Sequence, residues 1–177
     1  MKDRIQELIA SNQLDQAKQL LISACSDHPG DCDCWLLLST VYGHLGDFSK
    51  CIDCSRKSIT LAPDNPNAYT NLAVALVSAG DFISAIEPYS EIVRLQPTSP
   101  VALNNLGSAY AAAEKFQKAT HYFRKALELQ PGYTEAQMNL AAAYRRSQNL
   151  EPAIQVYREI VNKYPGQVQP SYQLANT

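Results

Sequence analysis

Hydrophobic residues recur along the chain at steps of three and four, the spacing that places them on one face of an α-helix. Leu103, Leu106 and Tyr110 form one such series, and a second amphipathic segment begins a few residues later. This second segment ends before Pro131, because proline cannot continue a helix. The pattern therefore predicts two helices joined by a turn within residues 100–133.

The two-helix pattern returns along the chain with a period of 34 residues. A column of prolines and a column of small residues both keep this step without interruption. The prolines are Pro29, Pro63, Pro97, Pro131 and Pro165, and the small residues are Ala17, Cys51, Ala85, Ala119 and Ala153. The predicted repeats are residues 1–31, 32–65, 66–99, 100–133 and 134–167. Because one helical hairpin cannot bury its own apolar face, these repeats are expected to stack.

Two positions depart from the repeat pattern. Ser55 occupies a column in which the other repeats have leucine, tyrosine or phenylalanine, so the second repeat is expected to pack most loosely. Pro88 lies inside the predicted second helix of the third repeat, where a proline typically costs about 3 kcal/mol. We therefore expect a local bend at Pro88.

The repeat unit resembles the tetratricopeptide repeat, whose pattern is W-x2-L-G-x2-Y, then A-x3-F, then P. Residues 100–133 match this pattern with Leu103 in the tryptophan position, and residues 32–65 match it in part. The resemblance implies an all-α fold, a right-handed α-α superhelix of five helix-turn-helix repeats with a short C-terminal helical cap. Residues 168–177 are expected to form that cap, and residues 1–177 a single solenoid domain.

The first helix of each repeat has a face that the packing does not use, and the resemblance implies that these faces line a concave groove. Asn71, Asn105 and Asn139 occupy the same position on this face in three successive repeats. A side-chain amide both donates and accepts, so it can pair with the backbone of an extended peptide. The row resembles the asparagine ladder in the superhelical domain of O-GlcNAc transferase, although solvated or local hydrogen bonding is an alternative interpretation. Since these side chains face away from the core, replacing them is expected to leave stability nearly unchanged.

Other positions on the same helix faces extend the predicted peptide-binding site. Beside the asparagine row, the predicted contacts are Thr70, Asn104, Leu36, Leu37, Arg145 and Arg146. The two leucines are expected to form an exposed apolar strip with Val74, Val77 and Val101. The two arginines suit a carboxylate on the partner, although an ordinary solvated helix end explains them equally well.

Composition and charge narrow the class of partner. The chain of 177 residues is 46% hydrophobic and 18% charged, as is usual for a folded globular protein. Its net charge of −2 gives no basic excess, so a nucleic-acid partner is not expected. No apolar run approaches the roughly 20 residues of a spanning helix, so membrane insertion is not expected either.

The cysteines are the one group that suggests a metal. Cys32 and Cys34, and then Cys51 and Cys54, have spacings seen in zinc sites. However, alanine replaces Cys34 and Cys51 in the matching columns of other repeats, so both are predicted to be small buried residues. We predict no metal and no cofactor, and the odd number of cysteines favours reduced thiols in a cytoplasmic protein.

Three functional hypotheses follow from these features. The leading one is a non-catalytic protein–protein interaction scaffold that binds an extended peptide or partner segment in its groove, since no catalytic motif is found. The alternative is the N-terminal substrate-recognition domain of a larger enzyme, such as an O-GlcNAc-transferase-like glycosyltransferase, a methyltransferase or a sulfotransferase. The third is self-association through the apolar strip. A clamp for acidic chaperone tails is not expected, because the groove lacks the necessary basic residues.

Overall fold

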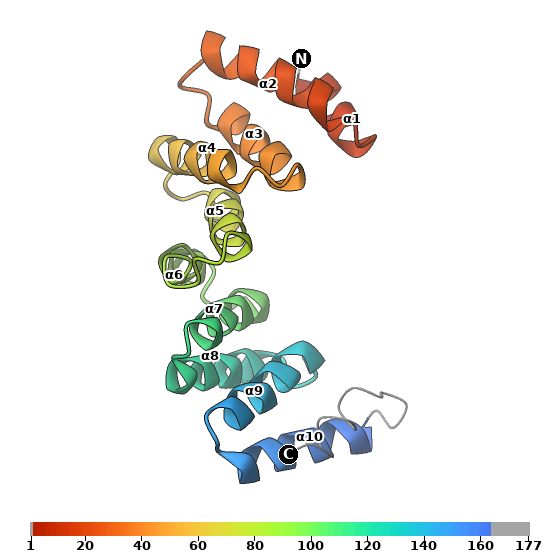
Figure 1. The fold of residues 1–177 in the computed structure, drawn as a ribbon, viewed down its shortest axis with the longest axis vertical. Coiled ribbons are helices and arrows are strands. Elements are labelled where there is room, and N and C mark those ends of the chain that lie inside the picture. The colour runs from red at the N-terminus through yellow and green to blue at the C-terminus, as the bar shows by residue number, and fades with distance from the viewer. Residues whose placement is uncertain (1, 164–177) are drawn as a thin grey trace. The chain divides into compact units, whose positions relative to one another are not determined.

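The computed structural model describes residues 2–163, and within this range the chain is entirely α-helical (Figure 1). The helices are α1 (Lys2–Ala10), α2 (Leu14–Asp27), α3 (Cys32–His44), α4 (Phe48–Leu61), α5 (Pro66–Ser78), α6 (Ile86–Leu95), α7 (Pro100–Ala112), α8 (Phe116–Leu129), α9 (Thr134–Arg146) and α10 (Leu150–Lys163). They pair in chain order into the predicted hairpins. The predicted cap over residues 168–177 lies outside the described residues.

The turn inside each hairpin is set by one residue in the left-handed region of backbone conformation. These residues stand 34 apart, and their φ values are 57° at Asn12, 75° at Gly46, 81° at Gly80, 59° at Glu114 and 62° at Gln148. Glycine adopts this conformation without a steric penalty, whereas the three other residues are strained by it. The structure thus repeats one turn geometry even where the sequence does not repeat glycine.

Several first helices begin at a polar capping residue. The Asp31 carboxylate accepts hydrogen bonds from the backbone of α3, and the Asn65 side chain accepts one at the start of α5. Ser99 does the same for α7. Such caps each stabilise a helix by about 1 kcal/mol, because they satisfy backbone N–H groups that have no partner inside the helix.

Contacts within the chain divide it into two compact units, unit 1 (residues 1–95) and unit 2 (residues 96–177), and each is described by itself below. Unit 1 contains α1 to α6, and unit 2 contains α7 to α10. The boundary falls at the end of α6, shortly before the end of the third predicted repeat. A single solenoid domain over residues 1–177 stays a prediction.

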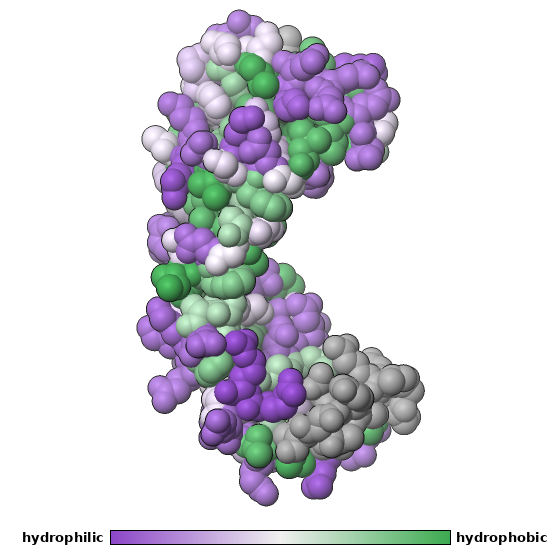
Figure 2. Space-filling view, viewed as in Figure 1, coloured by the Kyte–Doolittle hydropathy of each residue, from purple (hydrophilic) through white to green (hydrophobic). Residues whose placement is uncertain are grey.

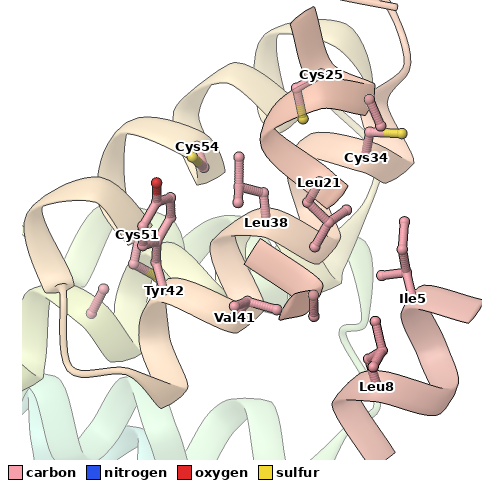
Figure 3. Close-up of a cluster of buried hydrophobic side chains, with 13 residues drawn as sticks. Ile5, Leu8, Leu21, Cys25, Cys34, Leu38, Val41, Tyr42, Cys51 and Cys54 are labelled. Atoms are coloured by element: carbon pink, nitrogen blue, oxygen red, sulfur yellow. The ribbon is translucent and has the colours of Figure 1, made fainter. Parts of the chain in front are cut away.

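The core of unit 1 is built from aliphatic side chains and thiols. Figure 3 shows a cluster of this core in which Leu21, Leu38 and Val41 lie among buried cysteines. Cys34 and Cys51 are 5% and 2% exposed, as their columns predict. Burial raises the pKa of Cys25 to about 12 and that of Cys54 to about 11. These thiols therefore stay protonated and uncharged at neutral pH.

In unit 2 Gly107 of α7 marks a tight contact between helices. A Cβ atom at this position would lie 2.7 Å from two carbons of the Phe123 ring in α8. Glycine is therefore required here by the bulk of its partner. In unit 1 Ser39 takes the place of Gly107 and Ser55 takes the place of Phe123, and both serines are fully buried. The small Ser55 side chain thus leaves room for a residue larger than glycine at position 39.

The third hairpin corrects the expectation of a bend at Pro88. Residues 82–85 form a turn, and α6 begins only at Ile86, so the helix loses its first turn instead of bending. Proline has no N–H and its ring clashes with the carbonyl four residues earlier, which is that of Ser84. Pro88 thus lies in the first turn of α6, where no N–H is needed.

The same turn brings apolar side chains to the surface of unit 1. Ile83 is 69% exposed and Phe82 is 36% exposed. Figure 2 shows a dark green area at the level of α6, where residues of high hydropathy are visible. Asp81 still caps the turn, because its carboxylate accepts a hydrogen bond from the Ser84 backbone at 3.0 Å.

Candidate functional site

In unit 1, the first helices α3 and α5 line an open pocket of about 360 Å³. Thr40 and His44 approach it from α3, and Asn71, Val74 and Ser78 from α5. The pocket combines hydroxyl and amide groups with an apolar side chain, since Val74 is 50% exposed. Its place on the first helices agrees with the face that the sequence leaves free of core packing.

Asn71 holds the two helices of this pocket together. Its Nδ2 donates hydrogen bonds to Ser39 Oγ at 2.7 Å and Thr40 Oγ1 at 2.9 Å, and lies 3.5 Å from the Leu36 carbonyl oxygen. These bonds fix the plane of the amide. Within residues 2–163 no hydrogen bond reaches Asn71 Oδ1, so this oxygen is available to a donor from outside.

Asn139 is held in the same way in unit 2. Its Nδ2 donates to Asn104 Oδ1 at 3.0 Å and to Ser108 Oγ at 3.4 Å. Thr40 and Ser108 each precede their asparagine by 31 residues. The two asparagines are therefore equivalent parts of a repeated helix-to-helix connection, and these bonds favour a loss of stability on replacing them, contrary to the expectation from the sequence.

Asn104 is placed where it cannot serve as a ligand contact. Its side chain is fully buried. Its Nδ2 donates to Glu135 Oε1 at 3.0 Å, while its Oδ1 accepts from Asn139. Both ends of the amide therefore connect α7 to α9. The prediction of Asn104 as a groove contact is corrected, because the groups that it was expected to offer are already used.

Asn105 and Thr70 lie closer to solvent. Asn105 is half-buried on α7, and Thr70 is exposed on α5. The Thr70 hydroxyl donates to the Pro66 carbonyl at 2.9 Å, one helical turn earlier. Asn105 is therefore partly accessible and remains a candidate contact. The Thr70 hydroxyl, in contrast, already donates its hydrogen bond within α5.

Both predicted arginines have partners inside unit 2. Arg146 donates to the Ala111 carbonyl at 3.2 Å near the end of α7, and its guanidinium lies 5.0 Å from the centre of the Phe116 ring. Burial raises the pKa of Tyr157, and the positive charge of the nearby Arg145 opposes this rise. These contacts supply an intramolecular role for each side chain, so their capture of a partner's carboxylate stays a prediction.

The predicted apolar strip is only partly exposed. Leu36 and Leu37 are half-buried, and Leu37 packs against the core cluster of unit 1. Val74 in unit 1 is 50% exposed and Val101 in unit 2 is 53% exposed. The valines therefore carry the exposed apolar surface, and the leucines belong largely to the packing of α3.

The described part of the chain also limits other kinds of site. Among residues 2–163, no group of three or more His, Cys, Asp and Glu side chains could hold a metal ion. In the same range, no helix combines the length and the hydropathy that crossing a membrane requires.

The partners of the asparagines are the part of the site that sequence reasoning missed. Ser39, Thr40, Ser108 and Glu135 all contact the amide network, yet none was a candidate. A polar residue 31 positions before each of Asn71 and Asn139 is the sequence signal that identifies them. That signal has meaning only once the 34-residue repeat is known to bring neighbouring first helices together.

Comparisons with known proteins agree on one fold. Three family models, each described as "Tetratricopeptide repeat", match residues 33–65, 54–87 and 104–168. No curated protein sequence matches the chain.

Solved structures match over almost the whole chain. MamA from Desulfovibrio magneticus RS-1 aligns with a TM-score of 0.86 at 18% identity, covering 94% of both chains. YrrB, described as "a TPR protein with an unusual peptide-binding site", aligns at 0.86 and 18% over 96% of this chain and 87% of its own. A tetratricopeptide repeat protein from Parabacteroides merdae aligns at 0.88 and 16% over 98% and 69%. At these identities the similarity shows a shared fold.

Proposed function

Because this chain belongs to the tetratricopeptide repeat family and has its all-α superhelical fold, we propose that it is a non-catalytic scaffold that binds an extended segment of a partner protein along its first helices. The observation that carries this proposal is the geometry of Asn71. Its amide nitrogen is held by two hydroxyl groups of α3, and the residue lines the pocket between α3 and α5 with no hydrogen bond on its oxygen within residues 2–163.

A fixed amide oxygen is a suitable acceptor for a peptide N–H. The hydrogen bonds to Ser39 and Thr40 orient the Asn71 side chain before any ligand arrives, so less side-chain freedom is lost on binding. Since Nδ2 is already engaged, the asparagine accepts from a peptide and does not also donate to it. Asn139 offers the same acceptor in unit 2.

The surroundings of Asn71 favour an uncharged stretch of the partner. Helix α5 contains no charged residue, and Val74 beside the asparagine is 50% exposed. An extended strand that places an apolar side chain on Val74 brings its backbone N–H towards Asn71 Oδ1. We therefore expect binding that depends little on salt, because no ion pair contributes to it.

The charge of unit 1 also bears on the partner class. Residues 1–95 carry twelve Asp and Glu against seven Lys and Arg, so this unit repels a polyphosphate backbone. All five cysteines are thiols in the structure, which suits a reducing compartment such as the cytoplasm. The proposed partner is accordingly a protein segment met inside the cell.

The proposal is tested with peptides selected on the whole chain from a display library of random sequences. For a selected peptide, Asn71→Ala should weaken binding about two- to tenfold, the effect of one net hydrogen bond. Ser39→Ala keeps the Asn71 oxygen but removes one of the bonds that hold the amide, so it should weaken binding less than Asn71→Ala does. If Asn71→Ala and Asn139→Ala both leave the affinity of every selected peptide unchanged, the proposed site is wrong.

A further inference from the structure

Two tyrosines in equivalent positions have different neighbours. Tyr42 in α3 and Tyr110 in α7 stand two repeats apart in the same column. In unit 2 the Tyr110 ring is covered by Tyr122 of α8, with ring centres 5.5 Å apart and planes inclined by 7°. In unit 1 the residue that matches Tyr122 is Cys54 of α4, which supplies no ring.

A pocket of about 260 Å³ lies beside Tyr42 in unit 1. Cys54 lines it from α4, Trp35 from α3, and Ile22 and Cys25 from α2. Figure 3 shows Tyr42 and Cys54 next to each other between α3 and α4. The pocket thus borders the tyrosine at the place where the repeat pattern of unit 2 provides a second ring.

Both tyrosines have a lysine over the ring. The Lys50 ammonium lies 5.3 Å from the centre of the Tyr42 ring, and the Lys118 ammonium lies 5.4 Å from that of Tyr110. These lysines are themselves two repeats apart. The two sites therefore share the tyrosine and its lysine, and they differ in Cys54 against Tyr122 and in Trp35 against Leu103.

We propose that this pocket of unit 1 binds one aromatic side chain of a partner polypeptide, stacked on Tyr42 as Tyr122 is stacked on Tyr110. The site lies between α2 and α4, away from the pocket that contains Asn71, so it does not depend on the peptide-binding role proposed above.

The size of the pocket fits a single ring. A cavity of about 150 Å³ is enough to hold benzene. Pockets for drug-sized ligands begin at about 300 Å³, so this pocket is too small for most free cofactors. A side chain that enters from the surface and leaves its backbone outside fits this volume, as Tyr122 does in unit 2.

The walls of the pocket are rigid and largely uncharged. The Trp35 indole Nε1 donates to the Pro29 carbonyl at 2.9 Å, which holds the ring in place. Burial raises the pKa of both thiols in the lining, so neither carries charge at neutral pH. The charged groups of the lining are Lys50 and Asp53, both exposed. Such an apolar interior with charges at its rim favours a neutral ring over a charged group.

Trp35 is the single tryptophan of the chain, so its fluorescence reports on the pocket directly. N-acetylphenylalaninamide is the probe, because it presents one aromatic side chain on a peptide backbone. It should change the Trp35 signal saturably, and N-acetylleucinamide should bind about two- to tenfold more weakly, since it lacks the ring. Equal binding of the two compounds, or no saturable change with the first, would overturn the proposal.

Substitutions at the matching positions test the same idea from both sides. Cys54→Tyr should fill the pocket and abolish the signal, while Cys54→Ala keeps it open and should retain binding. Tyr122→Cys should uncover the Tyr110 ring of unit 2 and add a second site for N-acetylphenylalaninamide, seen as shifts of backbone amide resonances in α7 and α8. The Tyr122→Cys variant tests the proposal if Cys54→Tyr does not fold. Unchanged binding in a folded Cys54→Tyr variant, or no second site in Tyr122→Cys, would refute the proposal.

Discussion

The connection between Asn139 and Asn104 should contribute measurably to the stability of unit 2. Asn139→Ala removes the hydrogen bond to Asn104 Oδ1, whose donor–acceptor distance is 3.0 Å. Asn104 is fully buried, so water does not replace the lost donor. The substitution therefore leaves a buried acceptor without a partner in addition to removing the bond itself.

The expected magnitude follows from these two parts. A buried acceptor that loses its partner costs about 1–3 kcal/mol, whereas an ordinary net hydrogen bond contributes about 0.5–1.5 kcal/mol. We expect Asn139→Ala to lower the free energy of unfolding by about 2 kcal/mol. Ser108→Ala is the matched control. It removes only the longer bond of 3.4 Å from Asn139, which keeps its bond to Asn104, and should cost less than about 0.5 kcal/mol.

Urea unfolding of the whole chain, followed by circular dichroism, measures both changes. The double variant Asn104→Leu/Asn139→Leu sharpens the test, because replacing both partners by apolar groups of similar shape leaves no unsatisfied acceptor. Its loss of stability should be smaller than that of Asn139→Ala alone. If Asn139→Ala is no more destabilising than Ser108→Ala, the reasoning about the amide network is wrong.

Three further predictions concern backbone, packing and pH. Gln148→Gly should raise the free energy of unfolding by about 0.5–1 kcal/mol, because φ is 62° at this position, and Gly46→Gln should lower it. Thermal melts that shift in the same direction for both variants would contradict this. Gly107→Ala should destabilise the chain by about 1–2 kcal/mol, because its Cβ would meet the Phe123 ring at 2.7 Å. Adding Phe123→Leu should recover part of this loss in urea titrations. The absence of any recovery would argue against this contact. The folded-state pKa of Cys25 is raised from 9.0 to about 12, so its contribution to stability is present below about pH 9 and is lost as the pH rises towards 12. Cys25→Ala should therefore flatten the alkaline fall in melting temperature, and an unchanged slope would contradict the assignment.

The sequence predicts the local features of this fold well because each is decided within one repeat. The prolines that end the second helices and the small residues at close contacts recur every 34 residues, and the observed hairpins follow them. Gln148 adopts the same left-handed conformation as Gly46 although it is not a glycine, so the repeat fixes the turn geometry at both positions. Fold class could therefore be predicted without any knowledge of contacts between repeats.

What the sequence leaves open depends on competition between alternatives of similar energy. Pro88 must disturb its helix, but a bend and a late start both remove the clash, and the local sequence does not decide between them. The asparagines pose a similar problem. An amide on an open helix face can bind water, a ligand or a neighbour, and the choice of Ser39 and Thr40 depends on the exact register of α3 against α5.

The late start of α6 has a consequence for the motions of unit 1. Residues 82–85 form a turn outside any helix, and α6 has 10 residues where α4 has 14. A shorter helix has fewer interior amides to protect, and local opening requires fewer bonds to break. Amide hydrogen exchange in the third hairpin should then be faster than in the second. We therefore expect this turn to open more readily than the second hairpin, next to the exposed side chain of Ile83.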